Sequence, residues 1–153
     1  QRPFALVYGH SFAPDFAAKV RDWADRRGLP LLSLGYRNDW ADMQWLTADP
    51  HDYAHAFSRA EAVATNFFHG CVFALANEKP FAAGLTEYRS IKVRGLMELL
   101  DAERHVVASE GGVDELLDEP IEPRILSRIE ELRQTSTAFL VRALEGSHAA
   151  HAA

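Results

Sequence analysis

Five short runs of this chain are almost wholly apolar, and amphipathic stretches with helical periodicity separate them. The runs cover residues 4–8, 31–34, 62–66, 80–85 and 105–108. Strands that are apolar on both faces are typical of a parallel sheet covered by helices on both sides. The pattern therefore predicts a doubly wound α/β domain, with a parallel sheet of four or five strands and helices on both faces.

The remaining segments complete this prediction. Helices are expected at residues 15–27, 49–60, 70–77, 91–100 and 113–117 and from Pro123 onward, whereas residues 37–47 are expected to form a loop. Residues 146–153 have no periodicity and are expected to be a mobile tail, so residues 1–145 form a single domain. Because an apolar run opens the chain almost at once, without Met, we expect a C-terminal domain excised from a longer polypeptide.

Composition narrows the classes of function. The chain has 22 acidic and 16 basic residues, a net charge of −6, which disfavours a nucleic-acid partner. A single cysteine, Cys71, excludes an internal disulfide and fits a reducing compartment. No apolar run is long enough to span a bilayer, and the chain does not open with a basic-then-apolar signal pattern. We therefore expect a cytoplasmic protein with no transmembrane segment.

Ligands of doubly wound sheets bind beyond the carboxyl ends of the strands. The expected strands place four segments there: residues 8–12, 36–39, 66–70 and 85–89. His10 lies in the first of these and is a candidate ligand-binding residue, although no motif surrounds it.

The most informative segment runs from Asn66 to Gly70, between an expected strand and an expected helix. Backbone amides at a helix start attract phosphate or carboxylate, and His69 beside them can donate a hydrogen bond or a proton. Asn66 and Gly70 are candidates for the same binding site. The alternative is a histidine that only caps the helix or bonds to a backbone carbonyl.

A basic segment follows the fourth expected strand. Arg89, Lys92 and Arg94 lie within six positions and could bind phosphate and carboxylate oxygens. The alternative is a solvated helix start with no ligand.

Three other features are weaker. His51 and His55 have a metal-ligand spacing, but Asp52 stands where the zinc-protease motif needs glutamate, so a surface pair is favoured. Cys71 lies near a helix start, where a nucleophile is conceivable, but a buried, inert thiol is favoured. Trp40 and Trp45 lie in the expected loop and could contact a sugar.

Residues 65–73 resemble the polysaccharide pyruvyl transferase family, whose members have a strand ending in Thr, a short polar pair, Phe or Leu, His-Gly and an apolar helix. The resemblance continues downstream at Lys79-Pro80-Phe81, Arg94, Leu99-Leu100 and Arg104, and upstream through the opening strand and residues 58–64.

The resemblance implies the C-terminal half of a two-domain enzyme of the GT-B type. Such an enzyme moves the enolpyruvyl unit of phosphoenolpyruvate onto a sugar diol of a saccharide or lipid-linked saccharide, in surface-polysaccharide synthesis. It implies no metal and no organic cofactor, and the missing N-terminal domain would be a partner. His69 matches the family histidine that holds the donor or acts as acid. Arg94 matches the family arginine, with Lys92 or Arg89 as helpers.

One position departs from the family pattern. Many members have Arg or Ser where this chain has Phe67, which removes one anion contact or hydroxyl. Two alternatives therefore stay open: a related glycosyltransferase half that binds a nucleotide sugar, and a non-catalytic binding domain that has lost the site.

Overall fold

The computed structural model describes residues 2–85, 90–107 and 112–151, with side chains as far as residue 144. Its centre is a six-stranded Rossmann-like sheet in the order β3-β2-β1-β4-β5-β6, in which every neighbouring pair is parallel. The strands are β1 (Ala5–Tyr8), β2 (Leu31–Leu34), β3 (Met43–Trp45), β4 (Val63–Thr65), β5 (Phe81–Gly84) and β6 (Val106–Val107). The predicted α/β class and parallel sheet are confirmed.

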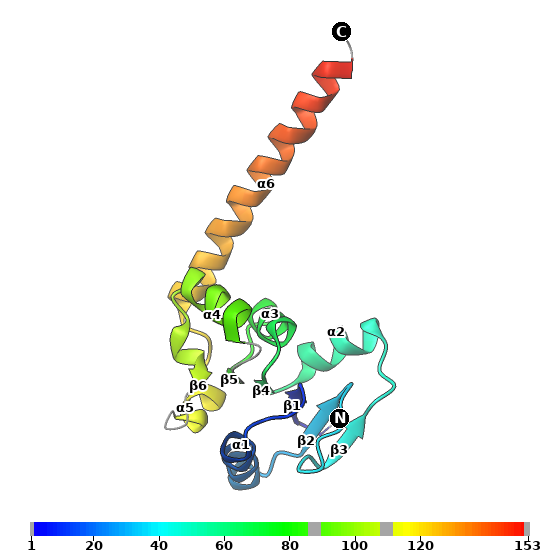
Figure 1. The fold of residues 1–153 in the computed structure, drawn as a ribbon, viewed down its shortest axis with the longest axis vertical. Coiled ribbons are helices and arrows are strands. Elements are labelled where there is room, and N and C mark those ends of the chain that lie inside the picture. Colours follow the sequence, from blue (N-terminus) through cyan, green and yellow to red (C-terminus); the bar gives the residue numbers. More distant parts are fainter. Residues whose placement is uncertain (1, 86–89, 108–111, 152–153) are drawn as a thin grey trace. The chain divides into compact units, whose positions relative to one another are not determined.

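Helices cover both faces of the sheet, as predicted. They are α1 (Pro14–Arg27), α2 (Pro50–Arg59), α3 (Phe68–Ala76), α4 (Ser90–Leu99) and α5 (Val113–Asp118), with a short 3-10 helix at Glu103–His105. Helices α1 and α5 pack together on one face, and α2, α3 and α4 lie on the other (Figure 1). Burial from both sides explains the apolar strands, since Leu6, Val63 and Phe81 are fully buried.

The number of strands differs from the expected four or five, because residues 43–45 form a strand within the segment expected to be a loop. This strand, β3, lies at the edge of the sheet and pairs only with β2 among the described strands. Met43 and Gln44 are exposed. An edge strand whose side chains face solvent needs no apolar pattern, so hydropathy could not indicate it.

A second difference concerns the start of α3. The helix begins at Phe68, two residues before the expected range of 70–77. His69 is therefore in the first turn of the helix, not in the turn that precedes it.

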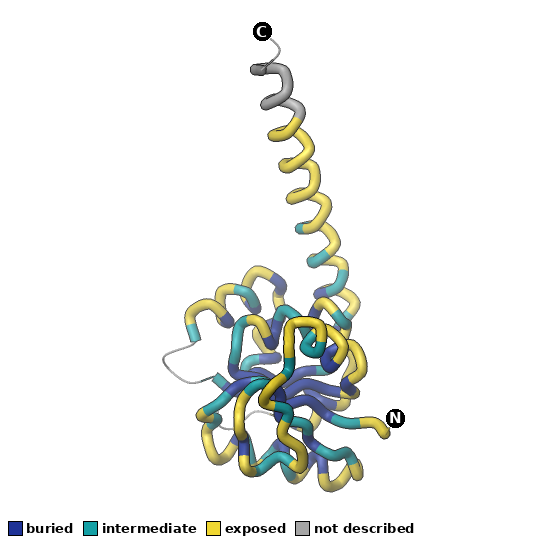
Figure 2. The backbone as a smooth tube through the Cα atoms, turned by 90° about the vertical axis from the view of Figure 1, so that its right-hand side faces the viewer, coloured by how far each residue is buried: buried dark blue, intermediate teal, exposed yellow. Residues whose placement is uncertain are grey.

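The chain divides into two compact units, Gln1–Ile121 and Glu122–Ala153, and the second consists mainly of helix α6 (Pro123–His151). The helix continues past Gly146, into the segment expected to be a tail. Figure 2 shows much of α6 as exposed. Four large apolar residues of this helix are exposed: Phe139, Leu140, Val141 and Leu144. Within the described residues, no helix is both long enough and apolar enough to cross a membrane.

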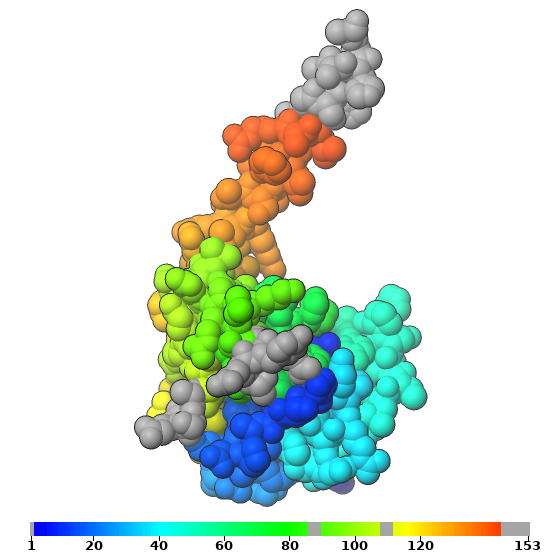
Figure 3. Space-filling view, in the orientation of Figure 1, coloured from blue at the N-terminus to red at the C-terminus, as the bar shows by residue number. Residues whose placement is uncertain are grey.

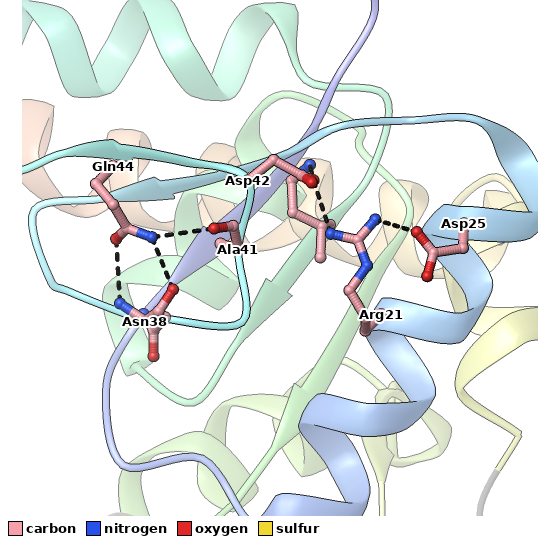
Figure 4. A network of polar contacts seen from close by, with 7 residues as sticks. Arg21, Asp25, Asn38, Ala41, Asp42 and Gln44 are labelled. Atoms are coloured by element: carbon pink, nitrogen blue, oxygen red, sulfur yellow. Dashed lines mark hydrogen bonds and ion pairs between the residues drawn. The ribbon is translucent and has the colours of Figure 1, made fainter.

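A polar network holds the β3 edge to helix α1 (Figure 4). The Asp42 carboxylate, just before β3, accepts hydrogen bonds from the Leu31 backbone N–H and from Arg21, both at 2.7 Å. Arg21 also pairs with Asp25 at 2.7 Å. These contacts lower the pKa of the Asp42 carboxyl, the Leu31 amide contributing most and Arg21 next. The network substitutes for the apolar burial that this edge lacks.

We expect Asp42→Asn to lower the free energy of unfolding by about 1 kcal/mol at pH 7, since solvent screens this half-exposed carboxylate. The pKa of Asp42 is lower in the folded than in the unfolded state, where it is about 4. The stabilisation by its carboxylate is therefore fully present above about pH 4, and it is lost as the pH falls through the pKa of the folded state. Urea unfolding at pH 7 and pH 3 measures it, and the variant and the parent chain should converge at pH 3.

Asp39→Asn is the matched control, because Asp39 and Arg37 form an ion pair between two largely exposed side chains. It should change the stability much less. A deficit for Asp42→Asn that is equal at both pH values would contradict a role for its charge.

Candidate functional site

Three consecutive backbone carbonyls, of residues 8–10, are each held by a side chain from a neighbouring strand end or loop. Thr65 Oγ1 donates to the first at 2.6 Å, Asn38 Nδ2 to the second at 2.9 Å and Asn66 Nδ2 to the third at 2.7 Å. Thr65 and Asn66 lie at the end of β4, and Asn38 follows β2. We call these three hydrogen bonds the carbonyl brace. They fix the chain where it leaves β1, at the carboxyl edge of the sheet.

The segment held by the brace has an unusual backbone. Gly9 has φ 146° and Ser11 has φ 55°. A Cβ atom on Gly9 would lie 2.1 Å from Asn66 Oδ1, so only glycine fits against this fully buried amide. Non-glycine residues with positive φ are uncommon and persist where their surroundings hold them. The brace supplies that restraint.

Next to the brace, five ring side chains gather; we call them the aromatic edge: Tyr8, His10, Tyr36, Tyr53 and Phe67. Ring centroids are 5.1 Å apart for His10–Tyr36 and Tyr36–Phe67, 5.3 Å for Tyr8–Phe67 and 5.5 Å for Tyr8–Tyr53 and His10–Phe67. The chain after β1, in blue, and the chain after β2, in light blue, lie side by side on the same face of the molecule (Figure 3). The predicted candidate His10 is part of this group.

The tyrosines of the aromatic edge influence one another. Burial raises the pKa of the Tyr8 hydroxyl, and Tyr53 and Tyr36 raise it further. Burial and then Tyr36 raise the pKa of Tyr53. The phenols of Tyr8 and Tyr53 are therefore neutral at physiological pH.

His69 lies at the carboxyl edge beyond β4, as predicted, and its side chain is exposed. Phe67 is the N-cap residue of α3, and no side-chain cap hydrogen bond is formed there among the described residues. The alternative in which His69 caps the helix is thus wrong. The first amides of a helix have no partner within it, so this end attracts anions beside the imidazole.

The close packing of α3 against the end of β4 explains why residue 70 is a glycine. A Cβ atom there would lie 2.0 Å from Thr65 Oγ1, the same atom that holds the carbonyl of Tyr8 and accepts from the Phe67 N–H at 3.1 Å. Glycine lets the first turn of α3 approach the end of β4 closely. It therefore sets the position of the neighbouring His69.

A cavity of about 240 Å³ opens at the carboxyl ends of β5 and β6. We call it the β5 cavity; its lining residues are Ala13, Asp15, Phe16, Lys19, Gly84, Leu85, Arg94 and Val107. Arg94 comes from α4 and Lys19 from α1, so two cations from opposite faces of the sheet meet there, with Asp15 beside them. This charge distribution favours an anionic ligand.

The remaining candidates are placed as follows. Lys92 is exposed on α4 and is not among the residues that line the β5 cavity. Arg89 lies outside the described residues. Asn66 is fully buried, and its amide bonds to the backbone of His10, so the contact that the structure shows is one of positioning. Sequence analysis did not identify Lys19, because nothing in its neighbourhood distinguishes it from a surface lysine of an amphipathic helix.

The structure also places the weaker candidates, the thiol of Cys71 and the pair His51 and His55. Burial raises the pKa of the Cys71 thiol to about 12, which confirms the buried, inert thiol and excludes a nucleophile at neutral pH. His51 and His55 are exposed on α2. No group of three or more potential metal ligands occurs within the described residues.

Comparison with known proteins adds one finding. The family model for polysaccharide pyruvyl transferase matches residues 3–85, more than half of the chain. The matched part contains the carbonyl brace, the aromatic edge, His69 and Lys19, whereas Arg94 lies beyond it. No curated protein matches the chain.

The packing of α3 against β4 can be tested at Gly70. We expect Gly70→Ala to lower the free energy of unfolding by about 1–3 kcal/mol, since the added methyl group overlaps Thr65. Gly95→Ala, in α4, is the control because a Cβ atom there meets nothing within 4 Å. It should leave the stability unchanged or raise it by up to about 1 kcal/mol. Equal urea midpoints for the two variants would show that α3 does not need this close approach.

Proposed function

The chain belongs to the polysaccharide pyruvyl transferase family, and we propose that it takes part in transferring the enolpyruvyl unit of phosphoenolpyruvate to two hydroxyls of a saccharide. The family is one of enzymes. The observation that carries the proposal for this chain is the exposed imidazole of His69 at an uncapped helix start, on the carboxyl edge of the sheet.

The reaction defines what the site must supply. The methylene carbon of phosphoenolpyruvate gains a proton and becomes a methyl group, which makes the adjacent carbon electrophilic. Two sugar hydroxyls add to that carbon, each losing a proton, while the bond to phosphate breaks. One of the two protons replaces the one that was donated, and phosphate carries away the other. The site therefore needs a group that gives and recovers a proton, together with contacts for two anions.

In this proposal His69 is the proton donor. A histidine titrates near neutral pH and can give a proton in one step and recover it in a later one. Its exposure lets it reach a bound substrate, and the close packing of Gly70 against Thr65 holds the helix turn that carries it. The uncapped amides beside it would bind one anionic group of the donor.

Arg94 and Lys19 would bind the other anionic group, in the β5 cavity. Both line this cavity. Arginine binds carboxylate or phosphate through two parallel hydrogen bonds, and lysine adds a compact charge. Lys92 and Arg89 remain possible helpers in the proposal, and the role of Gly70 and Asn66 is to position the site.

We further propose that the chain is the C-terminal half of a two-domain enzyme of the GT-B type, with the site facing the other half. Donor binding can then be measured on the 153-residue chain itself, whereas turnover needs the two-domain polypeptide. The pathway proposed is surface-polysaccharide synthesis.

We expect His69→Ala to lower turnover of the two-domain polypeptide roughly a hundredfold or more, the scale for a proton-transfer group. The assay follows phosphate released from phosphoenolpyruvate in the presence of a saccharide acceptor. His51→Ala, which removes an exposed histidine on α2, is the control and should leave turnover unchanged. Near-normal turnover in His69→Ala would exclude the catalytic role.

Arg94→Ala should weaken phosphoenolpyruvate binding to the 153-residue chain by about 1.5–3 kcal/mol, the contribution of a charge-assisted hydrogen bond. Isothermal titration measures the affinity. Arg26→Ala removes an arginine from the last turn of α1, at the opposite end of the helix from the cavity, and should have no effect. Binding of a nucleotide sugar in place of phosphoenolpyruvate would favour the glycosyltransferase alternative, and binding of neither would favour the non-catalytic one.

A further inference from the structure

The aromatic edge has features that a packing cluster does not need. Tyr36 is 36% exposed, and Tyr8, His10, Tyr53 and Phe67 are all partly exposed. The rings are thus not sealed in the core, although they lie within ring-contact distance of one another. Exposed aromatic surface at the carboxyl edge of such a sheet is where a ligand is expected.

Three members of the group carry hydroxyls that no described residue binds. Within the described part of the chain, the hydroxyls of Tyr8, Tyr36 and Tyr53 form no hydrogen bonds. Their rings lie close together, with centroids 6.2 Å apart for Tyr8–Tyr36 and 5.5 Å apart for Tyr8–Tyr53. Buried tyrosine hydroxyls usually find a partner, so hydroxyls left to solvent are available to a ligand. The group therefore offers aromatic faces and neutral hydroxyls together.

The charge of the group narrows the ligand class. None of its five side chains is a lysine or an arginine, whereas the β5 cavity contains one of each. A phosphate or carboxylate would be bound better in the cavity than on neutral rings. A neutral ligand that has both an apolar face and several hydroxyls fits the aromatic edge, and a pyranose ring has this chemistry.

The site is also prearranged. The carbonyl brace and the close approach of Gly9 to Asn66 fix the chain that carries Tyr8 and His10. Gly35, with φ 73°, leaves room for the Tyr53 hydroxyl, which would lie 1.9 Å from a Cβ atom there. Rings that are already held in place lose little conformational entropy when a ligand binds.

We propose that the aromatic edge is a subsite for a neutral pyranose ring of the saccharide acceptor, with Tyr36 as the main stacking contact. The assignment of this sugar as the acceptor rests on the proposed function, whereas the binding of a sugar does not. In the order of the strands, this subsite spans the ends of β2, β1 and β4, and the β5 cavity lies at the next strand. His69 follows β4, so it lies on the side of the subsite that is nearer to the cavity.

The test is a titration of the 153-residue chain with three neutral disaccharides, lactose, maltose and chitobiose, followed by ¹H–¹⁵N NMR. At least one should shift the resonances of residues 8–11 and 36. Tyr36→Ala should weaken its affinity roughly tenfold, and Tyr36→Phe, which keeps the ring, should lose roughly threefold or less. Phe139→Ala removes an aromatic ring that is more exposed than Tyr36, from α6, and is the control, with no change expected.

Phosphoenolpyruvate binding, measured in the same variants, separates this proposal from the proposed function. Tyr36→Ala should leave it unchanged, and Arg94→Ala should leave disaccharide binding unchanged. The subsite proposal is overturned if no disaccharide binds, if Tyr36→Ala binds as well as the parent chain, or if uridine displaces the sugar. Loss of phosphoenolpyruvate binding alone would overturn the proposed donor and leave the sugar subsite in place.

Discussion

The carbonyl brace is the constraint on which the rest of the site depends. Three side chains hold three successive carbonyls just after β1, and two of them, Thr65 and Asn66, are adjacent at the end of β4. A chain that leaves a buried strand needs partners for its carbonyls, because an unpaired buried polar group costs stability. Here the side chains that bind these carbonyls also connect the ends of β1, β2 and β4. The need of the backbone carbonyls for hydrogen-bond partners therefore fixes the arrangement of the carboxyl edge.

Close glycine contacts make this arrangement tight. Gly9 admits the Asn66 amide, Gly70 admits the Thr65 hydroxyl, and Gly84 lies under the Phe16 ring, which a Cβ atom would approach within 2.6 Å. Each contact brings a helix or loop closer to a strand end than a larger residue would allow. The side chains of the carbonyl brace and these glycines therefore act together to position the carboxyl edge.

Phe67 shows how one residue can change the chemistry of such an edge. Its ring lies within 5.5 Å of the rings of Tyr8, His10 and Tyr36, and it precedes the helix that carries His69. An arginine at this position would place a charge in the middle of the group. With phenylalanine, the aromatic edge has no lysine or arginine, and Arg94 and Lys19 lie in the cavity at β5.

The sequence by itself determined the α/β class, five of the six strands and the location of His69 at the carboxyl edge. It could do so because burial on both faces makes a strand apolar, and because parallel strands all end at one edge. Only the tertiary structure decided that β3 exists, that Phe67, His10 and Tyr36 touch, and that Lys19 and Arg94 line one cavity. An exposed edge strand has no apolar pattern. Which distant residues meet at one edge or line one cavity depends on strand order and side-chain direction, which hydropathy does not encode.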